Sequence, residues 1–442
     1  MQKLTWRQLA AVGSMLFGLF FGAGNLIFPV AMGQLAGRNL WAAAAGFLIT
    51  GVGLPLLGVA ALGLSRESGL LALSSRVGRG YGLAFTCALY LTIGPFFAIP
   101  RCATVSYTVG IAPLAPGGGA ALGVFSLAFF AVVLFFSLRP GQILTWVGKV
   151  LNPLFLAFLA VLVLRALAAP LGQAAAVEPA GAYRAAPFAT GLLEGYNTMD
   201  ALAGLAFGIL VVQAIRRLGV RAPGDVAVST VCAGVFSSAL MAGIYLLVTL
   251  VGAQSRGRFA AAANGGEALA RIAAAYFGRA GALILAATVT VACLKTAVGL
   301  ITSCGETFVE IFPHGPSYRV WAVGFCLLSF LIANLGLDAI LAWSQPVLMA
   351  LYPLAIVLIL LTLAGPLYGD DRAVLRGGLG CTAAAAVLEF LRALPAGAAP
   401  AVQPVVDWAA AWLPLYAKGF GWVLPAAVGC AAGLVVRARR SR

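Results

Sequence analysis

Long apolar stretches separated by short polar connections run along the whole chain. Each stretch covers roughly 18 to 25 residues, enough for a helix to cross a hydrocarbon core of about 30 Å. This pattern predicts an all-α membrane protein, a single integral membrane domain over residues 1–442, with about twelve spans. The spans are expected at 8–31, 40–64, 81–110, 121–138, 143–165, 190–215, 226–252, 280–311, 319–335, 338–363, 374–394 and 415–437.

The spans divide into two units of similar length. Spans one to five cover 8–165 and spans six to ten cover 190–363, whereas 374–437 holds two peripheral helices. Because five is odd, the second unit enters the membrane from the opposite face. The two units are therefore predicted to form a five-plus-five inverted repeat.

Two of the predicted spans are interrupted by glycine and polar residues. Gly22–Asn25, followed by Pro29, breaks the first apolar segment, and Gly195–Asp200 breaks the sixth, about 170 residues further along. Lipid offers no partner to a freed backbone group, so a broken helix at membrane depth survives only where it lines an enclosed cavity. We therefore predict discontinuous helices 1 and 6 around a binding site, as in a carrier.

Composition agrees with a membrane protein, and charge placement excludes a nucleic-acid partner. Hydrophobic residues make up 62% of the chain and charged residues only 9%, with a mean hydropathy of +1.01. The net charge is +15, but Lys and Arg gather in connections that a cytoplasmic N-terminus places in the cytoplasm, such as 216–221 and 437–440. This bias is typical of a multi-pass protein of the cytoplasmic membrane with both termini inside the cell.

The chemistry of the first break suits a zwitterion. Backbone N–H groups that open the second half-helix suit a carboxylate, while carbonyls that close the first suit an ammonium group or a sodium ion. An amino acid matches both. Asn25 offers a side-chain carbonyl for a cation or, alternatively, caps the second half-helix from within the break.

At the second break, polar side chains cluster at Tyr196, Asn197, Thr198 and Asp200. An ionisable residue at this depth is costly, so Asp200 is expected to face a cavity or a partner. Two roles remain open. Asp200 attracts a substrate amine or cation or forms a gate contact, or it is a helix cap or structural ion pair.

The third span carries a proline-bracketed apolar stretch and a buried cation. Pro95 and Pro100 kink the helix, so the side chains between them either line a pocket for an aliphatic group or simply pack in the core. These side chains are Phe96, Phe97 and Ile99. Arg101 needs a partner or an aqueous path within the span, and Asp200 is one candidate.

A lysine inside the eighth span is unexpected on composition. Lys295 lies in the run Thr288–Ser303. Either its side chain reaches the membrane surface, which a mid-span position makes hard, or its ammonium group occupies a polar site. The second reading is favoured.

Several motifs together resemble a known transporter family. They are Gly22–Pro29, Gly51–Pro55, Thr92–Arg101, Glu194–Gly208, Ala292–Ser303 and Asn334–Gly336. In this order they are similar to the branched-chain amino acid:cation symporters, the branched-chain amino acid transport system II carriers of bacteria. The resemblance implies the leucine-transporter (LeuT-type) fold of the amino acid-polyamine-cation superfamily, alternating access, and import of leucine, isoleucine and valine with sodium or protons.

The resemblance also implies roles for individual residues. The backbone of Ala23 and Gly24 would bind the substrate carboxylate, with Asn25 near a cation. Residues Tyr196, Asn197 and Thr198 would contact the substrate amine and side chain.

The superfamily's common sodium site would fall on Gly18, Phe21, Ala292 and Thr296, where two adjacent hydroxyl side chains are usual. Here Lys295 stands in place of one hydroxyl. The lysine ammonium either replaces sodium and couples transport to protons, or sodium coupling is retained. Apart from this coupling ion, no cofactor, further metal or obligatory protein partner is expected; the partners are a small amino acid and the lipid bilayer.

Rival functions have less support in the sequence. An intramembrane enzyme would depend on Asp200, Glu306, His314 and Asp338, which are spread over different helix ends without metal-ligand or nucleophile–base spacing. A channel needs rings of charged or carbonyl groups, and none is evident. Within transporters, a carrier of other small neutral amino acids is the nearest alternative.

Overall fold

Helices are the only regular elements among the residues that the structure describes. This computed structural model describes residues 4–65, 67, 69–112, 118–139, 144–395, 397 and 399–440. The α-helices are α1 (Trp6–Phe20), α2 (Ala23–Ala36), α3 (Leu40–Leu48), α4 (Leu54–Ser65), α5 (Leu70–Ser75), α6 (Arg79–Leu91), α7 (Ala98–Val105), α8 (Gly118–Ser137), α9 (Asn152–Ala168), α10 (Pro187–Glu194), α11 (Asp200–Arg217), α12 (Pro223–Ser255), α13 (Gly265–Ile311), α14 (Tyr318–Ala333), α15 (Leu337–Leu363), α16 (Gly365–Tyr368), α17 (Arg372–Arg392), α18 (Ala399–Trp412) and α19 (Val423–Arg440).

The all-helical prediction is confirmed, and the exact number of spans stays a prediction. By length and composition, eight helices in the described part of the chain can cross a membrane, and the bent pair 187–198 and 200–217 raises this to nine. The first span falls short because its break leaves α1 with 15 residues, and α14 has only 16. The last helix begins at Val423 rather than near 415, because Leu415 and Gly419 adopt left-handed backbone conformations around a short turn.

Several of the predicted spans are irregular rather than straight. The third span passes through a π-helical turn at Thr92–Phe96, where Pro95 interrupts the ladder, before α7 begins. The eighth span is the second part of α13, because Gly278, with φ of +55°, folds the preceding 265–277 stretch back. Proline and glycine are the usual causes of such kinks, and both were visible in the sequence.

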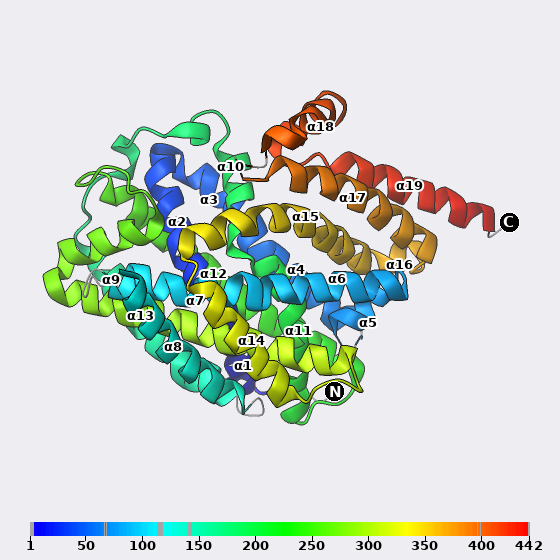
Figure 1. Cartoon of the computed structure of the whole chain (residues 1–442), viewed down its shortest axis with the longest axis horizontal. Helices are drawn as coiled ribbons and strands as arrows, with labels where there is room; N and C mark the ends of the chain where they lie inside the picture. The colour runs from blue at the N-terminus through cyan, green and yellow to red at the C-terminus, as the bar shows by residue number, and fades with distance from the viewer. Residues whose placement is uncertain are drawn as a thin grey trace.

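Helix α11, which follows the second break, lies inside the bundle (Figure 1). Helix α11 contacts α1, α4, α12, α13 and α15, and nearly all of its side chains are buried. Helix α8 is at the outside, and only about a fifth of its apolar stretch is buried. Helices α17 and α19 pack together at one edge of the molecule (Figure 1).

Helix α2 is fixed against α12 by small residues on both sides. A methyl group added at Gly33 would lie 2.0 Å from the carbonyl oxygen of Thr249, and one added at Gly252 would lie 2.4 Å from that of Val30. The two backbones therefore approach too closely for any side chain, as at other glycine-mediated crossings in membranes. This contact positions α2, the second half of the first broken helix.

We expect Gly33→Ala to destabilise the protein by about 1–3 kcal/mol, because the new methyl group overlaps a backbone oxygen that has no rotamer to escape. The matched control is Gly243→Ala in α12, where nothing lies within 4 Å of the added methyl group. The measurement is the midpoint of thermal denaturation in detergent. Equal midpoints for the two variants would contradict the close crossing.

Candidate functional site

The first break separates α1 from α2 at Phe21 and Gly22. Phe21 leaves helical geometry with ψ of 87°, and Gly22 is extended. The N–H of Gly22 donates to Asn25 Oδ1 at 3.0 Å. In a continuous helix that N–H would donate to the carbonyl of Gly18. The break therefore frees a carbonyl at the end of α1, and the capping role considered for Asn25 is present.

The second break lies between α10 and α11, which bend by 42°. Gly195–Thr198 forms a 3₁₀ turn, and Met199 then adopts the left-handed conformation with φ of 65°. A bulky residue in this region is strained and persists only where its surroundings enforce it. Thr198 steadies the turn, since its Oγ1 donates to the Gly195 carbonyl at 2.9 Å and accepts from the Asp200 N–H at 3.3 Å.

A buried polar cluster of Asn25, Asp200 and Tyr245 joins the two breaks. Asn25 Nδ2 donates to Asp200 Oδ2 at 2.5 Å and also contacts the Tyr245 hydroxyl, which donates to the same carboxylate oxygen at 2.9 Å. Asp200 is also in the first turn of α11, where the helix dipole favours a negative charge. In the sequence, Asp200 is 175 residues and Tyr245 is 220 residues from Asn25. The cluster is therefore a tertiary link between the two helix breaks.

Arg101 of α7 binds the backbone of the second break. Its Nη1 donates to the Asn197 carbonyl at 3.0 Å, and its guanidinium carbon lies 5.7 Å from the centre of the Phe28 ring. No ion pair within 4.0 Å joins Arg101 to Asp200, both of which the structure describes. The conjectured direct Arg101–Asp200 pair is therefore absent from this conformation.

A small cavity lies where the two breaks meet. Its volume is about 30 Å³. One water needs roughly 10 to 15 Å³, so the cavity has room for water but is too small for an amino acid. Its lining residues are Leu19, Phe20, Gly22, Gly24, Asn25, Ile93, Ala98, Arg101, Cys102, Thr198, Met199, Asp200, Ala203, Phe207, Thr296 and Leu300.

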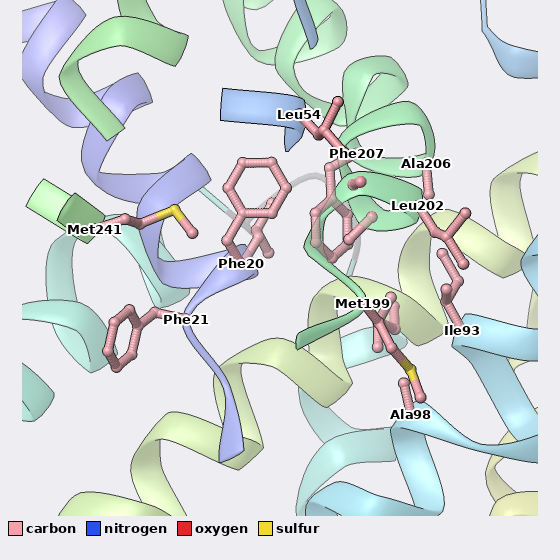
Figure 2. Close-up of a cluster of buried hydrophobic side chains, with 14 of the residues drawn as sticks. Phe20, Phe21, Leu54, Ile93, Ala98, Met199, Leu202, Ala206, Phe207 and Met241 are labelled. Atoms are coloured by element: carbon pink, nitrogen blue, oxygen red, sulfur yellow. The ribbon is translucent and has the colours of Figure 1, made fainter. Parts of the chain in front are cut away.

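One side of the cavity is apolar. Figure 2 shows Phe20 at the end of α1 and Phe207 of α11 beside one another, with Met199 and Ile93 nearby. The Phe20 and Phe207 ring centres are 5.7 Å apart. The cavity thus combines a polar side at the helix breaks with a side suited to an aliphatic group.

Comparison with known proteins places this arrangement in a family. The family model described as branched-chain amino acid transport protein matches residues 6–440. The chain belongs to the branched-chain amino acid transport protein family. It is therefore a transporter rather than an enzyme, and a multi-pass membrane protein.

Individual members of this transport family are similar over nearly their whole length. The branched-chain amino acid permease BrnQ of Lactobacillus delbrueckii subsp. lactis is 54% identical over 97% of this chain and 96% of its own. The branched-chain amino acid transport system 2 carrier protein of Pseudomonas aeruginosa is 42% identical over 98% and 97%.

The fold has a likeness among solved structures. Mhp1, a nucleobase-cation-symport-1 family transporter, matches with a TM-score of 0.61 and 13% identity, covering 97% of this chain and 91% of its own. At this identity the likeness concerns the fold alone.

Lys295 of this family member is enclosed by aromatic rings and a single amide. Its side chain is 0% exposed, so it does not reach the membrane surface. Nζ donates to Asn152 Oδ1 at 3.1 Å and lies 3.8 Å from the centre of the Phe155 ring, with Phe17 and Phe21 at 5.1 and 5.8 Å. Cation–π contacts and one neutral acceptor thus surround the ammonium group, with no carboxylate in an ion pair among the described residues.

Among the positions that the resemblance assigned to sodium, one side chain offers an oxygen to a cation. Thr296 lines the cavity, and its buried Oγ1 has no hydrogen-bond partner in the described part of the chain. A methyl group added at Gly22 would lie 3.0 Å from that oxygen. Together with the carbonyl freed at Gly18, Thr296 fits a cation-binding role, whereas Phe21 and Ala292 are buried beside it without a contact that distinguishes their carbonyls.

Other predicted substrate residues are placed differently. Gly24, Asn25 and Thr198 line the cavity, and Ala23 is the first residue of α2. The remaining five do not line the cavity. Tyr196 stacks on Tyr352 with ring centres 4.3 Å apart, and Asn197 Oδ1 accepts a hydrogen bond from Gln345 at 2.8 Å. In the third span, Phe96 is 39% exposed, Phe97 is partly buried and Ile99 is fully buried in the core.

Sequence reasoning missed three contributors to the site. Tyr245 and Asn152 each place a polar group inside an apolar span, a signal that was available because such groups are rare in lipid. Phe207 was not detectable in this way, since a phenylalanine within an apolar helix resembles any other core residue. Its role follows only from the packing of α1 against α11.

We expect Asn25→Ala to lower the free energy of unfolding by about 1–3 kcal/mol, because the Gly22 N–H and Asp200 Oδ2 each lose a buried partner. The control is Asn264→Ala, which also removes an asparagine cap, at the exposed start of α13. Thermal denaturation in detergent measures both. An effect at Asn25 no larger than that at Asn264 would mean that the cluster does not tie the breaks together.

Proposed function

We propose that this protein is a secondary symporter that imports branched-chain amino acids across a bacterial cytoplasmic membrane, with both termini in the cytoplasm. The observation that carries the proposal is the meeting of two interrupted helices at one cavity with a polar and an apolar side. The printed names of the relatives, branched-chain amino acid permeases and carriers, support the substrate class.

In the proposed complex the amino acid lies between the breaks. The backbone at Ala23 and Gly24 presents N–H groups at the start of α2, while the carbonyls of the second break suit the amine. The aliphatic side chain packs on the apolar side formed by Phe20, Ile93 and Phe207. Leucine, isoleucine and valine differ by at most a methylene or its branching, so one such wall accepts all three.

Transport then requires the cavity to open and enlarge. Because about 30 Å³ does not hold leucine, the apolar lining has to separate for substrate to enter. We propose alternating access in which one bundle of helices rocks against the rest, exposing the site first outside and then inside. The cluster of Asn25, Asp200 and Tyr245 keeps the two breaks together during this motion.

The coupling ion is a proton or sodium, and Lys295 favours the proton. A lysine enclosed away from water keeps its proton only while nearby groups replace the lost hydration, and here those groups are Asn152 and three phenylalanine rings. Its fixed charge would also repel a sodium ion at the neighbouring Thr296. The sodium alternative uses Gly18, Phe21, Ala292 and Thr296 as ligands.

Counterflow distinguishes a carrier from a channel. We expect proteoliposomes preloaded with unlabelled leucine to accumulate labelled leucine transiently, because exchange through an alternating site needs no ion gradient. Isoleucine and valine inside should act like leucine, and alanine should act poorly if the carrier prefers branched chains. Absence of any overshoot would contradict a carrier, and equal exchange with alanine would favour a carrier of small neutral amino acids.

For the coupling ion, we expect labelled leucine uptake to persist when sodium is replaced by potassium and to stop when the proton gradient is collapsed. Lys295→Gln should lose uptake driven by the proton gradient by at least about tenfold while retaining counterflow, since the substrate site is left intact.

The matched control for that experiment is Lys149→Gln, which removes an exposed lysine. It should leave both activities unchanged. Strict sodium dependence of the wild type, or proton-driven uptake by Lys295→Gln at the wild-type rate, would contradict proton coupling through Lys295.

A further inference from the structure

Two opposite charges line the cavity without direct contact between them. Arg101 of α7 is 5% exposed and Asp200 at the start of α11 is 2% exposed, and both line the same space between the helix breaks. No ion pair within 4.0 Å connects them. Buried charges are costly unless they are paired. Two separated charges at one cavity therefore suit a ligand that supplies an opposite charge to each.

Arg101 has donors left over on the side of the first break. One guanidinium nitrogen, Nη1, is used by the Asn197 carbonyl. The other, Nη2, lies beside Gly24, since a methyl group added at that glycine would be 3.1 Å away from it. A side chain at position 24 would therefore occupy the space next to Nη2, and glycine keeps it open. A guanidinium group in such a place is suited to a planar carboxylate.

Asp200, which lines the cavity, uses one carboxylate oxygen for its short hydrogen bonds. Oδ2 accepts from Asn25 and Tyr245, whereas no hydrogen bond to Oδ1 within 3.5 Å is found among the described residues. Both donors are neutral, so they orient the carboxylate without cancelling its charge. The free oxygen is suited to an ammonium group, which supplies the missing positive partner.

We propose that Arg101 binds the carboxylate of the transported amino acid and that Asp200 binds its ammonium group. The two side chains thus recognise the zwitterion by charge, in addition to the backbone dipoles of the breaks. This inference rests on the proposed function, because it assumes that the cavity takes an α-amino acid. The apolar side, with Phe20 and Phe207, is left for the substrate side chain.

The first test uses the wild type and two leucine analogues that each lack one charge. Leucinamide keeps the ammonium group and lacks the carboxylate, whereas 4-methyl-2-oxopentanoate keeps the carboxylate and lacks the ammonium group. In competition with counterflow of labelled leucine, each analogue should need at least about tenfold more than leucine for half inhibition, because a buried charge is left unpaired. An analogue that competes as well as leucine overturns the role of the residue facing its missing charge.

The second test crosses the analogues with charge-removing variants. In Asp200→Asn, the apparent affinity for leucine should fall by at least about tenfold, to within about twofold of that for 4-methyl-2-oxopentanoate. Leucinamide should still bind more weakly than leucine to this variant. In Arg101→Gln, leucine should converge with leucinamide instead. General destabilisation does not produce this crossed pattern. The control is Arg165→Gln, which removes an exposed arginine of α9 and should change none of the ratios.

Two results contradict the inference. Either both variants keep the wild-type preference for leucine over both analogues, or the two variants lose the same preference. If neither variant yields folded protein, the wild-type series decides alone. Wild-type protein that shows no leucine counterflow at all would instead contradict the proposed function, and that result is distinct from counterflow that discriminates against neither analogue.

Discussion

The hydrogen bonds from Asn25 and Tyr245 to Asp200 are the contact on which the rest of the site depends. A helix interrupted within a membrane leaves backbone groups that lipid cannot satisfy, and two such helices are stable only when their interruptions are enclosed together. The side-chain amide of Asn25 joins the two interruptions. Its oxygen accepts from the Gly22 N–H at the first break, and its nitrogen donates to Asp200 at the start of α11. One side chain thereby turns two local defects into one cavity.

The remaining features follow from that enclosure. Close contact of α2 with α12 needs glycine at 33 and 252, because side chains there would push α2 away from α12. Phe20 and Phe207 then meet across the space beside the breaks and keep it small. Next to the cavity-lining Thr296, Lys295 is joined through Asn152 to Ser14, so these side chains connect α13, α9 and α1. A change of charge at Lys295 would therefore act on α1, the first half of the first broken helix.

Much of the fold and part of the site could be predicted from the sequence. The breaks at Gly22 and Gly195 were recognisable because glycine and polar residues have no place in a lipid-facing helix, and Asp200 stood out for the same reason. Long-range pairings were not recognisable. Which donors meet Asp200, and that Arg101 turns to the Asn197 carbonyl rather than to a carboxylate, depend on how α7, α11 and α12 cross. Local patterns contain no information on those crossings.

The most direct test of the account is an experimental structure of the full chain determined with leucine bound. The account predicts leucine density between Gly24 and Asp200, with both helices interrupted at Gly22 and near Met199, and the substrate side chain against Phe20 and Phe207. Leucine density elsewhere in the bundle, or a first or sixth helix that runs without interruption past the ligand, would contradict it.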